Sequence, residues 1–309
     1  MVNKNKYENT KKEKTMRIEK PIIFIGTGRS GTTIISEIIM RHRDLAFPSN
    51  YQQVFFMIPE INLVRNVFDN KRWRIHGQKK QLNKVNIFNR YIFRQNEVYK
   101  MWEYITGDDI DFSRSFLVNK KETNKRIDYI HSYFQKMIKY QNRKRLTFKI
   151  TGPSRMEYLL SIFPDAYFVI LKRKPIPTIS SFLKVNFWKT RGLKKLWWSG
   201  VYSDEEMKWV NDHKDDPILL TTFQIKKMYD ITELECKKCN PNYIEVNYED
   251  FVKKPREEIT RILDFANLDK DNACLKYLKE NKIYNRNKPD SEYFSEEELE
   301  KINNILNID

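Results

Sequence analysis

The stretch that most constrains the fold runs from residue 21 to residue 40 and reads PIIFIGTGRSGTTIISEIIM. Residues 21–25 are all apolar, which is typical of a strand buried on both faces of a parallel sheet. The apolar residues at 34, 35, 38 and 39 then share one face of a helix. A glycine-rich turn joins the two elements. This order predicts an α/β fold with an anion-binding loop at the start of its first helix.

Short apolar stretches and amphipathic stretches alternate along much of the remaining chain. The expected strands are 146–150, 166–172 and 242–251, and the expected helices are 155–163, 176–188 directly after Pro175, and 256–266. This alternation implies a central parallel sheet with right-handed crossovers. We expect residues 21–309 to form a single α/β domain. Residues 55–145, with few strand signals and a clear helix at 126–141, are expected to be a helical insertion after the first strand and helix.

The chain is strongly basic, with 57 Lys and Arg against 41 Asp and Glu and a formal net charge of +16. Such a charge favours a polyanionic partner, which could be nucleic acid, an anionic membrane, an acidic polysaccharide or a phosphorylated cofactor. Residues 1–20 contain seven Lys or Arg and no apolar run. We expect a disordered basic leader there, and no secretory signal, since that needs an apolar segment. A cytoplasmic location is the corresponding expectation.

The three cysteines are Cys236, Cys239 and Cys274, too few for a disulfide scaffold. Cys236 and Cys239 form a C-x-x-C pair, but no second pair or nearby His completes four zinc ligands. Their surroundings look helical, where residues three apart share one face. We therefore expect a packing role and no metal.

The glycine-rich loop overlaps two phosphate-binding signatures without completing either. Gly26, Gly28 and Gly31 have the spacing of a dinucleotide site, but no strand ending in an acidic residue follows about 20 residues later. An ATP-binding P-loop places a Lys directly after its last glycine, where this chain has Thr32. The cation lies three residues earlier, at Arg29. This arrangement suits one terminal phosphate group better than a triphosphate.

The loop GRSGTT, residues 28–33, resembles the 5′-phosphosulfate loop of the sulfotransferases, P-loop-like enzymes that use 3′-phosphoadenosine 5′-phosphosulfate (PAPS). A second element of that family is an Arg that ends a later strand, followed eight residues on by a Ser, and Arg173 and Ser181 stand at this interval. Residues 146–190 and 242–290 resemble the family as well. The resemblance implies a P-loop-like three-layer fold and transfer of a sulfuryl group from PAPS to a hydroxyl or amine, without a metal.

The resemblance also implies roles for individual residues. Arg29 would stabilise the leaving group and Lys149 would face the transferring sulfonate, although Lys149 could equally cap a neighbouring helix. The candidate cofactor-binding residues are Gly28, Arg29, Ser30, Gly31, Thr32, Thr33, Arg173, Ser181, Arg286 and Lys288. Among them, Arg173 and Ser181 would hold the 3′-phosphate. Arg286 and Lys288 are either a further contact to the 3′-phosphate or adenine, or plain surface charge.

The sequence offers no clear general base. Asn50 stands where many family members carry a Glu, and its amide cannot usefully accept a proton. The base could be Glu60, Glu103 or His131 in the insertion, or the reaction could rely on orientation with little base catalysis. His42 matches a family position that is more often structural.

The acceptor and the alternatives stay open at this point. Trp188, Trp197 and Trp198 follow the expected 3′-phosphate helix and could line an acceptor pocket, stack on a ring or enter a membrane interface as a peripheral contact, or simply pack on the sheet. The acceptor could be a small molecule, a glycan or a lipid headgroup. The alternatives to a sulfotransferase are a kinase with a degenerate P-loop and a basic nucleic-acid-binding protein, whereas our interpretation has no nucleic-acid partner. The oligomeric state is not predicted.

Overall fold

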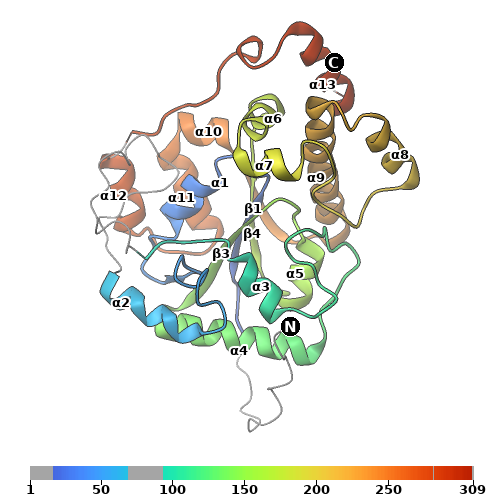
Figure 1. Cartoon of the computed structure of the whole chain (residues 1–309). Coiled ribbons are helices and arrows are strands. Elements are labelled where there is room, and N and C mark those ends of the chain that lie inside the picture. The colour runs from blue at the N-terminus through green and yellow to red at the C-terminus, as the bar shows by residue number, and fades with distance from the viewer. Residues whose placement is uncertain (1–16, 69–92, 281, 308–309) are drawn as a thin grey trace.

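The computed structural model describes residues 17–68, 93–280 and 282–307 of the chain. Its centre is a five-stranded, all-parallel sheet in the order β2-β3-β1-β4-β5 (Figure 1). The strands are β1 (Ile22–Gly26), β2 (Leu45–Ala46), β3 (Arg145–Thr151), β4 (Tyr167–Lys172) and β5 (Asn242–Asn247). The strand order changes direction at β1, so the chain that leaves β1 enters the crevice where open α/β sheets bind ligands.

Helices cover both faces of the sheet (Figure 1). They are α1 (Thr32–Ile39), η1 (Pro59–Val64), α2 (Arg65–Phe68), α3 (Tyr99–Ile105), α4 (Asn124–Tyr140), α5 (Met156–Ile162), α6 (Pro175–Leu183), α7 (Asn186–Arg191), α8 (Asp204–Asp212), α9 (Pro217–Cys239), α10 (Tyr248–Lys253), α11 (Pro255–Phe265), α12 (Asn272–Glu280), η4 (Asp290–Glu292) and α13 (Glu296–Leu306).

Alternate residues of β1 supply the two main parts of the core. Ile23 and Ile25 pack with α3, α4 and α5 on one face, whereas Ile22 and Phe24 pack with α1, α11 and α12 on the other. All four side chains are almost completely buried, as expected for a strand with helices on both sides. A third cluster joins α6, α7, α9 and α13. The predicted α/β fold, with helical layers on both sides of a parallel sheet, is therefore confirmed.

Most of the predicted elements are present within one or two residues of their expected bounds, but three differences remain. The strand expected at 242–251 ends at Asn247, and residues 248–253 form helix α10 instead. The two-residue strand β2 was not predicted, and it pairs with the start of β3 through Leu45 opposite Arg145. The helix after Pro175 was expected to continue to Trp188, but it ends at Leu183 and α7 starts at Asn186. The described part of the insertion contains η1, α2, α3 and α4, while residues 69–92 of it lie outside the described residues.

The tryptophans that could have faced a ligand or a membrane mostly pack inside the protein. Trp188 is fully buried and Trp198 retains 6% of its exposure. The ring centre of Trp197 lies 4.5 Å from the guanidinium carbon of Arg191 and 5.1 Å from that of Arg114. Packing is therefore the role that the structure gives Trp188 and Trp198. Of the helices described, none combines the length and the apolar character needed to cross a membrane.

The amino-terminal leader was predicted to end at residue 20. Residues 1–16 lie outside the described residues. In the part that is described, Ile18 is buried, and its N–H donates a hydrogen bond of 2.8 Å to His131 Nδ1. The backbone N–H of Lys20 donates to the carboxylate of Asp165 at 2.8 Å. These contacts fix the chain immediately before β1.

Candidate functional site

The loop between β1 and α1 is shaped by two residues with a left-handed backbone. Arg29 has φ 72° and Gly31 has φ 80°, and this region is uncommon for any residue other than glycine. A Cβ atom on Gly31 would lie 2.5 Å from the ring of Tyr248, so a glycine is required there. Ser30 is buried, and its hydroxyl donates to the carbonyl of Thr27 at 2.6 Å, which closes the turn. The loop therefore has a fixed shape at the amino end of α1.

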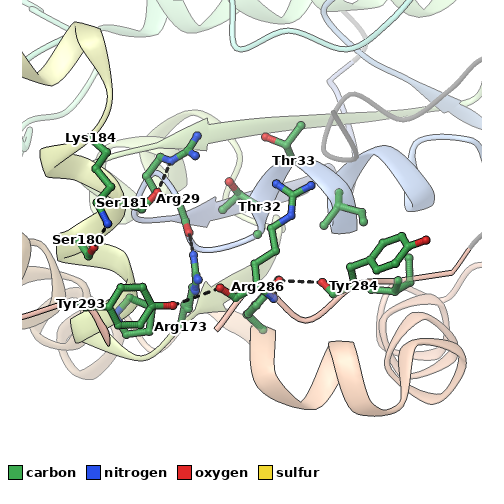
Figure 2. Close-up of a pocket in the computed structure, with 15 residues that line it drawn as sticks. Arg29, Thr32, Thr33, Arg173, Ser180, Ser181, Lys184, Tyr284, Arg286 and Tyr293 are labelled. Atoms are coloured by element: carbon green, nitrogen blue, oxygen red, sulfur yellow. Dashed lines mark hydrogen bonds between the residues drawn. The ribbon is translucent and has the colours of Figure 1, made fainter. Parts of the chain in front are cut away.

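A cavity of about 590 Å³ opens beside this loop (Figure 2). Its walls come from the loop and the start of α1, from α6, from Tyr248 at the start of α10, and from the chain between residues 283 and 293. The lining residues are Arg29, Gly31, Thr32, Thr33, Ile34, Arg173, Pro177, Ser180, Ser181, Lys184, Tyr248, Ile283, Tyr284, Arg286 and Tyr293. This volume lies within the range of roughly 300–1,000 Å³ that is usual for small-ligand sites.

Three arginines from separate parts of the chain meet at this cavity. They are Arg29 of the loop, Arg173 after β4 and Arg286 near the carboxyl end. Burial lowers the pKa of Arg29, and the positive charges of Arg173 and Arg286 lower it further. The cavity wall, which consists of described residues only, includes no Asp or Glu. This concentration of positive charge favours a bound anion.

The pair that the sequence singled out, Arg173 and Ser181, contacts the loop directly. Ser181 Oγ accepts a hydrogen bond of 2.9 Å from Arg29 Nε, and Arg173 donates one of 2.8 Å to the backbone carbonyl of Arg29 (Figure 2). Arg173 lies over the ring of Tyr248 at 4.8 Å and donates two hydrogen bonds to Asn287 Oδ1, at 2.9 and 2.6 Å. The structure thus brings together residues that lie far apart in the sequence.

Lys149 approaches the loop from the sheet, on the side of Thr33. It lies on β3, retains 5% of its exposure, and donates a hydrogen bond of 3.1 Å to Thr33 Oγ1. Its ammonium also forms a 2.9 Å ion pair with Glu97. Since Thr33 lines the cavity, Lys149 contacts the cavity wall from within the protein. Glu97 was not predicted from the sequence.

The remaining predicted binding residues lie outside the cavity wall. Gly28 and Ser30 belong to the loop but do not line the cavity. Phe182 packs closely at Gly28, since a Cβ atom there would lie 3.1 Å from its ring. Lys288 pairs with Glu292 at 2.7 Å, and both side chains are exposed. Of the two basic residues predicted near the carboxyl end, only Arg286 lines the cavity.

Asn50 and His42 form local structural contacts. The Asn50 side-chain oxygen accepts a hydrogen bond of 2.9 Å from the N–H of Arg94, whose carbonyl in turn accepts one of 2.9 Å from the N–H of Asn50. His42 Nδ1 accepts from the N–H of Asp44 at 3.1 Å, and its Nε2 lies 3.1 Å from the carbonyl of Asp269. Both residues therefore connect backbone segments.

The three alternative bases are also hydrogen-bonded away from the cavity. Glu60 accepts from the hydroxyl of Tyr140 at 3.2 Å, and Glu103 accepts from the N–H of Ser113 at 2.6 Å. His131 is buried, with both ring nitrogens within hydrogen-bond distance of backbone atoms, and burial lowers its pKa. None of these three residues lines the cavity.

The cysteines do not form a recognisable metal site. Cys236 and Cys239 lie on α9, and Cys236 packs against the core on the face that contacts α5. Burial raises the pKa of the Cys236 thiol to about 11 and that of Cys274 to about 12. Within the described ranges, no group of three or more His, Cys, Asp or Glu is arranged to hold a metal ion.

Comparisons with known proteins support the family resemblance. A sequence profile described as the sulfotransferase family matches residues 21–272. The fold is similar to that of sulfotransferase STF9 from Mycobacterium avium, with a TM-score of 0.58, 17% identity, and coverage of 94% of this chain and 76% of that one. Sulfotransferase STF1 from Mycobacterium tuberculosis H37Rv matches with a TM-score of 0.48, 13% identity and the same coverage. No curated protein matches the sequence.

Proposed function

Because this chain belongs to the sulfotransferase family, we propose that it transfers a sulfuryl group from PAPS to a hydroxyl or amine of a small-molecule acceptor. The observation that carries the proposal is the meeting of Arg29, Arg173 and Arg286 around a cavity with no carboxylate among the described residues of its wall. PAPS carries its negative charge at both ends of one ribose. A cavity with cations from three chain segments suits such a ligand.

The lining residues suggest how the donor would lie. The 5′-phosphosulfate would occupy the amino end of α1, where the first-turn N–H groups and the hydroxyls of Thr32 and Thr33 supply donors. The 3′-phosphate would lie against Arg173 and Ser181, with Arg286 beside them. This placement accounts for two cationic positions, one on each side of the ribose.

The reaction would be an in-line displacement at sulfur. The acceptor oxygen or nitrogen forms a bond to sulfur while the bond from sulfur to the 5′-phosphate oxygen breaks, and adenosine 3′,5′-bisphosphate (PAP) leaves with the bonding electrons. The acceptor proton passes to solvent or to a base. Arg29 and Lys149 would stabilise the charge that develops on the leaving oxygen and the sulfonate. Positioning of donor and acceptor supplies the rest of the rate increase.

The acceptor would present a hydroxyl or an amine to the sulfur atom of the donor. A small molecule, a glycan or a lipid headgroup with such a group would react by the same chemistry. The cytoplasmic location stays a prediction. The kinase alternative would require ATP with magnesium, and the nucleic-acid alternative would require a surface that reads a phosphate backbone.

Calorimetric titration of the full chain with PAP, and separately with ADP and magnesium, tests the proposal. We expect PAP to bind more tightly, because only PAP carries a 3′-phosphate for Arg173. A preference for ADP with magnesium would overturn the proposal in favour of a kinase. Binding that is equal for both nucleotides and falls steeply with salt would instead favour the nucleic-acid alternative.

A further inference from the structure

The carboxylate of Glu97 is held by donors from three residues. Its Oε1 accepts from the Lys149 ammonium at 2.9 Å. Its Oε2 accepts from the hydroxyl of Tyr99 at 2.8 Å, and from the hydroxyl and the N–H of Thr151 at 2.7 and 3.3 Å. The side chain retains 19% of its exposure. Glu97 thus lies in a nearly complete cage next to the end of β3.

This cage makes Glu97 unsuited to accept a proton from an acceptor. Burial alone would raise the pKa of Glu97, but the Lys149 ammonium and the hydrogen bonds from Thr151 and Tyr99 outweigh it, and the pKa lies below its usual range. A general base works best with a pKa near the working pH and with a lone pair that can reach the substrate. Any role of Glu97 in the reaction must therefore be exerted through the residues that surround it.

Lys149 is the residue that most needs this carboxylate. An ammonium group with so little exposure is costly to bury unless an anion and hydrogen-bond acceptors surround it. Glu97 supplies the anion, and Thr33 Oγ1 supplies an acceptor at the first turn of α1. With the Glu97 carboxylate behind it, the ammonium lies next to Thr33, which lines the cavity.

The backbone beside Glu97 is strained, and the strained conformation directs the Glu97 carboxylate toward Lys149. Val98 has φ 48° and ψ 53°, a left-handed conformation that is a genuine outlier for a β-branched residue. It is fully buried, and its N–H is held by Asn96 Oδ1 at 3.2 Å. The bend places the side chains of Glu97 and Tyr99 on the same partner, Thr151. Such strain persists where the surrounding contacts determine it, often at functional sites.

We propose that Glu97 is a positioning residue for sulfuryl transfer, which holds the Lys149 ammonium in place beside Thr33. The inference rests on the proposed function and adds to it a residue that does not touch the donor. In this proposal Lys149 supplies the positive charge for catalysis, and Glu97 holds the Lys149 ammonium in position. The Glu97 carboxylate also explains how a buried lysine is tolerated within β3, two residues before that strand ends.

A double-mutant cycle on PAPS hydrolysis tests the proposal without knowledge of the acceptor. In this slow reaction a water oxygen bonds to sulfur, the bond to the 5′-phosphate oxygen breaks, and PAP, sulfate and protons are released. We expect Lys149→Met to lower kcat about 100-fold and Glu97→Gln about 10-fold or more. Because Glu97 acts through Lys149, the double variant should be no slower than Lys149→Met.

Several outcomes would overturn the inference. Effects that multiply in the double variant would mean that Glu97 acts on its own, as a base would. A wild-type kcat for PAPS hydrolysis in a folded Glu97→Gln variant would mean that Glu97 has no part in the reaction. PAP titrations distinguish both of these outcomes from a failure of the proposed function. The variants should bind PAP within about threefold of the wild-type affinity, because PAP lacks the sulfonate. Absence of PAP binding to the wild-type chain would instead refute the proposed function.

Two further variants guard against an unfolded Glu97→Gln protein. Glu97→Asp keeps the charge but shortens the side chain, so the ammonium is drawn away from Thr33, and kcat should fall while the melting temperature holds. Full hydrolysis by this variant would contradict the proposal. Asp109→Asn is the matched control, because Asp109 is an exposed carboxylate of the same insertion that pairs with Lys120 at 3.3 Å. Its hydrolysis rate should equal that of the wild type.

Discussion

The phosphate loop is flanked by two groups of positive charge that are balanced in different ways. Arg29, Arg173 and Arg286 line the cavity, and no Asp or Glu belongs to its described wall. Lys149, on the sheet side, is nearly buried and paired with Glu97 at 2.9 Å. Arg173 and Arg286 repel the charge of Arg29, and an incoming anion relieves this repulsion, so the arginine group serves affinity. A balanced charge gains little from a ligand but stays in one place, so it suits a role in the chemical step.

The largest effect that would test this comparison is on PAP affinity. Arg173→Ala should weaken PAP binding about 100-fold, because it removes a partly buried cation from the 3′-phosphate position. Lys149→Met should change the same affinity less than about threefold. Calorimetry measures both, with Arg261→Ala on α11 as the control for loss of an exposed arginine paired with Glu258. Equal losses in Arg173→Ala and Lys149→Met would break the distinction between the two groups.

The loop that joins the two groups can be tested by adding one methyl group. Gly31→Ala should lower the free energy of unfolding by about 2 kcal/mol or more, because Gly31 has φ 80° and the new Cβ meets the Tyr248 ring at 2.5 Å. Gly200→Ala is the matched control, since Gly200 has φ 98° but no atom within 4 Å of the added Cβ. The difference between the two variants in urea unfolding isolates the close contact. A smaller loss in Gly31→Ala than in Gly200→Ala would show that Tyr248 moves aside.

The balanced pair also has a pH signature of its own. The pKa of Glu97 is lowered in the folded protein, so its contribution to stability is present above its unfolded pKa of about 4.3 and is lost as the pH falls through the folded value. The wild type should exceed Glu97→Gln in unfolding free energy by about 1–2 kcal/mol at pH 7. Urea unfolding at decreasing pH should show this gap closing below about pH 4. A constant gap would mean that the carboxylate charge is not what stabilises the pair.

The smallest effect is expected where a predicted binding residue lies outside the cavity. Lys288→Ala should change PAP affinity less than about twofold, since its exposed ammonium pairs with Glu292 at 2.7 Å. Arg286→Ala, two residues earlier, should weaken binding clearly in the same calorimetric titration. A strong loss in Lys288→Ala would show that the segment between residues 283 and 293 rearranges when the ligand binds.

The sequence predicted the parts of the site that follow from local patterns. The loop at 28–33, and the interval between Arg173 and Ser181, are readable because a strand end and a helix start fix where those side chains lie. The same reasoning located β1, β3, β4 and β5. It missed β2, since two residues within RHRDLAF carry no strand periodicity and pair only because β3 lies beside them.

The supporting residues were not predictable for a physical reason. Glu97 contacts Lys149 and Thr151, more than 50 residues away in the chain, from a segment with weak periodicity. Asn287, which orients Arg173, lies between the two cations that the sequence did single out. The unusual feature that points to Glu97 is the left-handed backbone at Val98, which only the structure reveals. A predicted contact between Glu97 and Lys149 would have been the signal that identifies Glu97 from the sequence.

The central position of β1 has a consequence for how the protein is made. The partners of β1 are β3, at residues 145–151, and β4, at residues 167–172. A nascent chain that emerges from the ribosome therefore carries a wholly apolar strand that lacks one or both of its partners until β4, more than halfway along the 309 residues, has been synthesised. The loop takes its final shape only after that point, when residues that arrive late, such as Tyr248, close over it. Nascent chains that stop before β4 would expose this strand to chaperones and to aggregation.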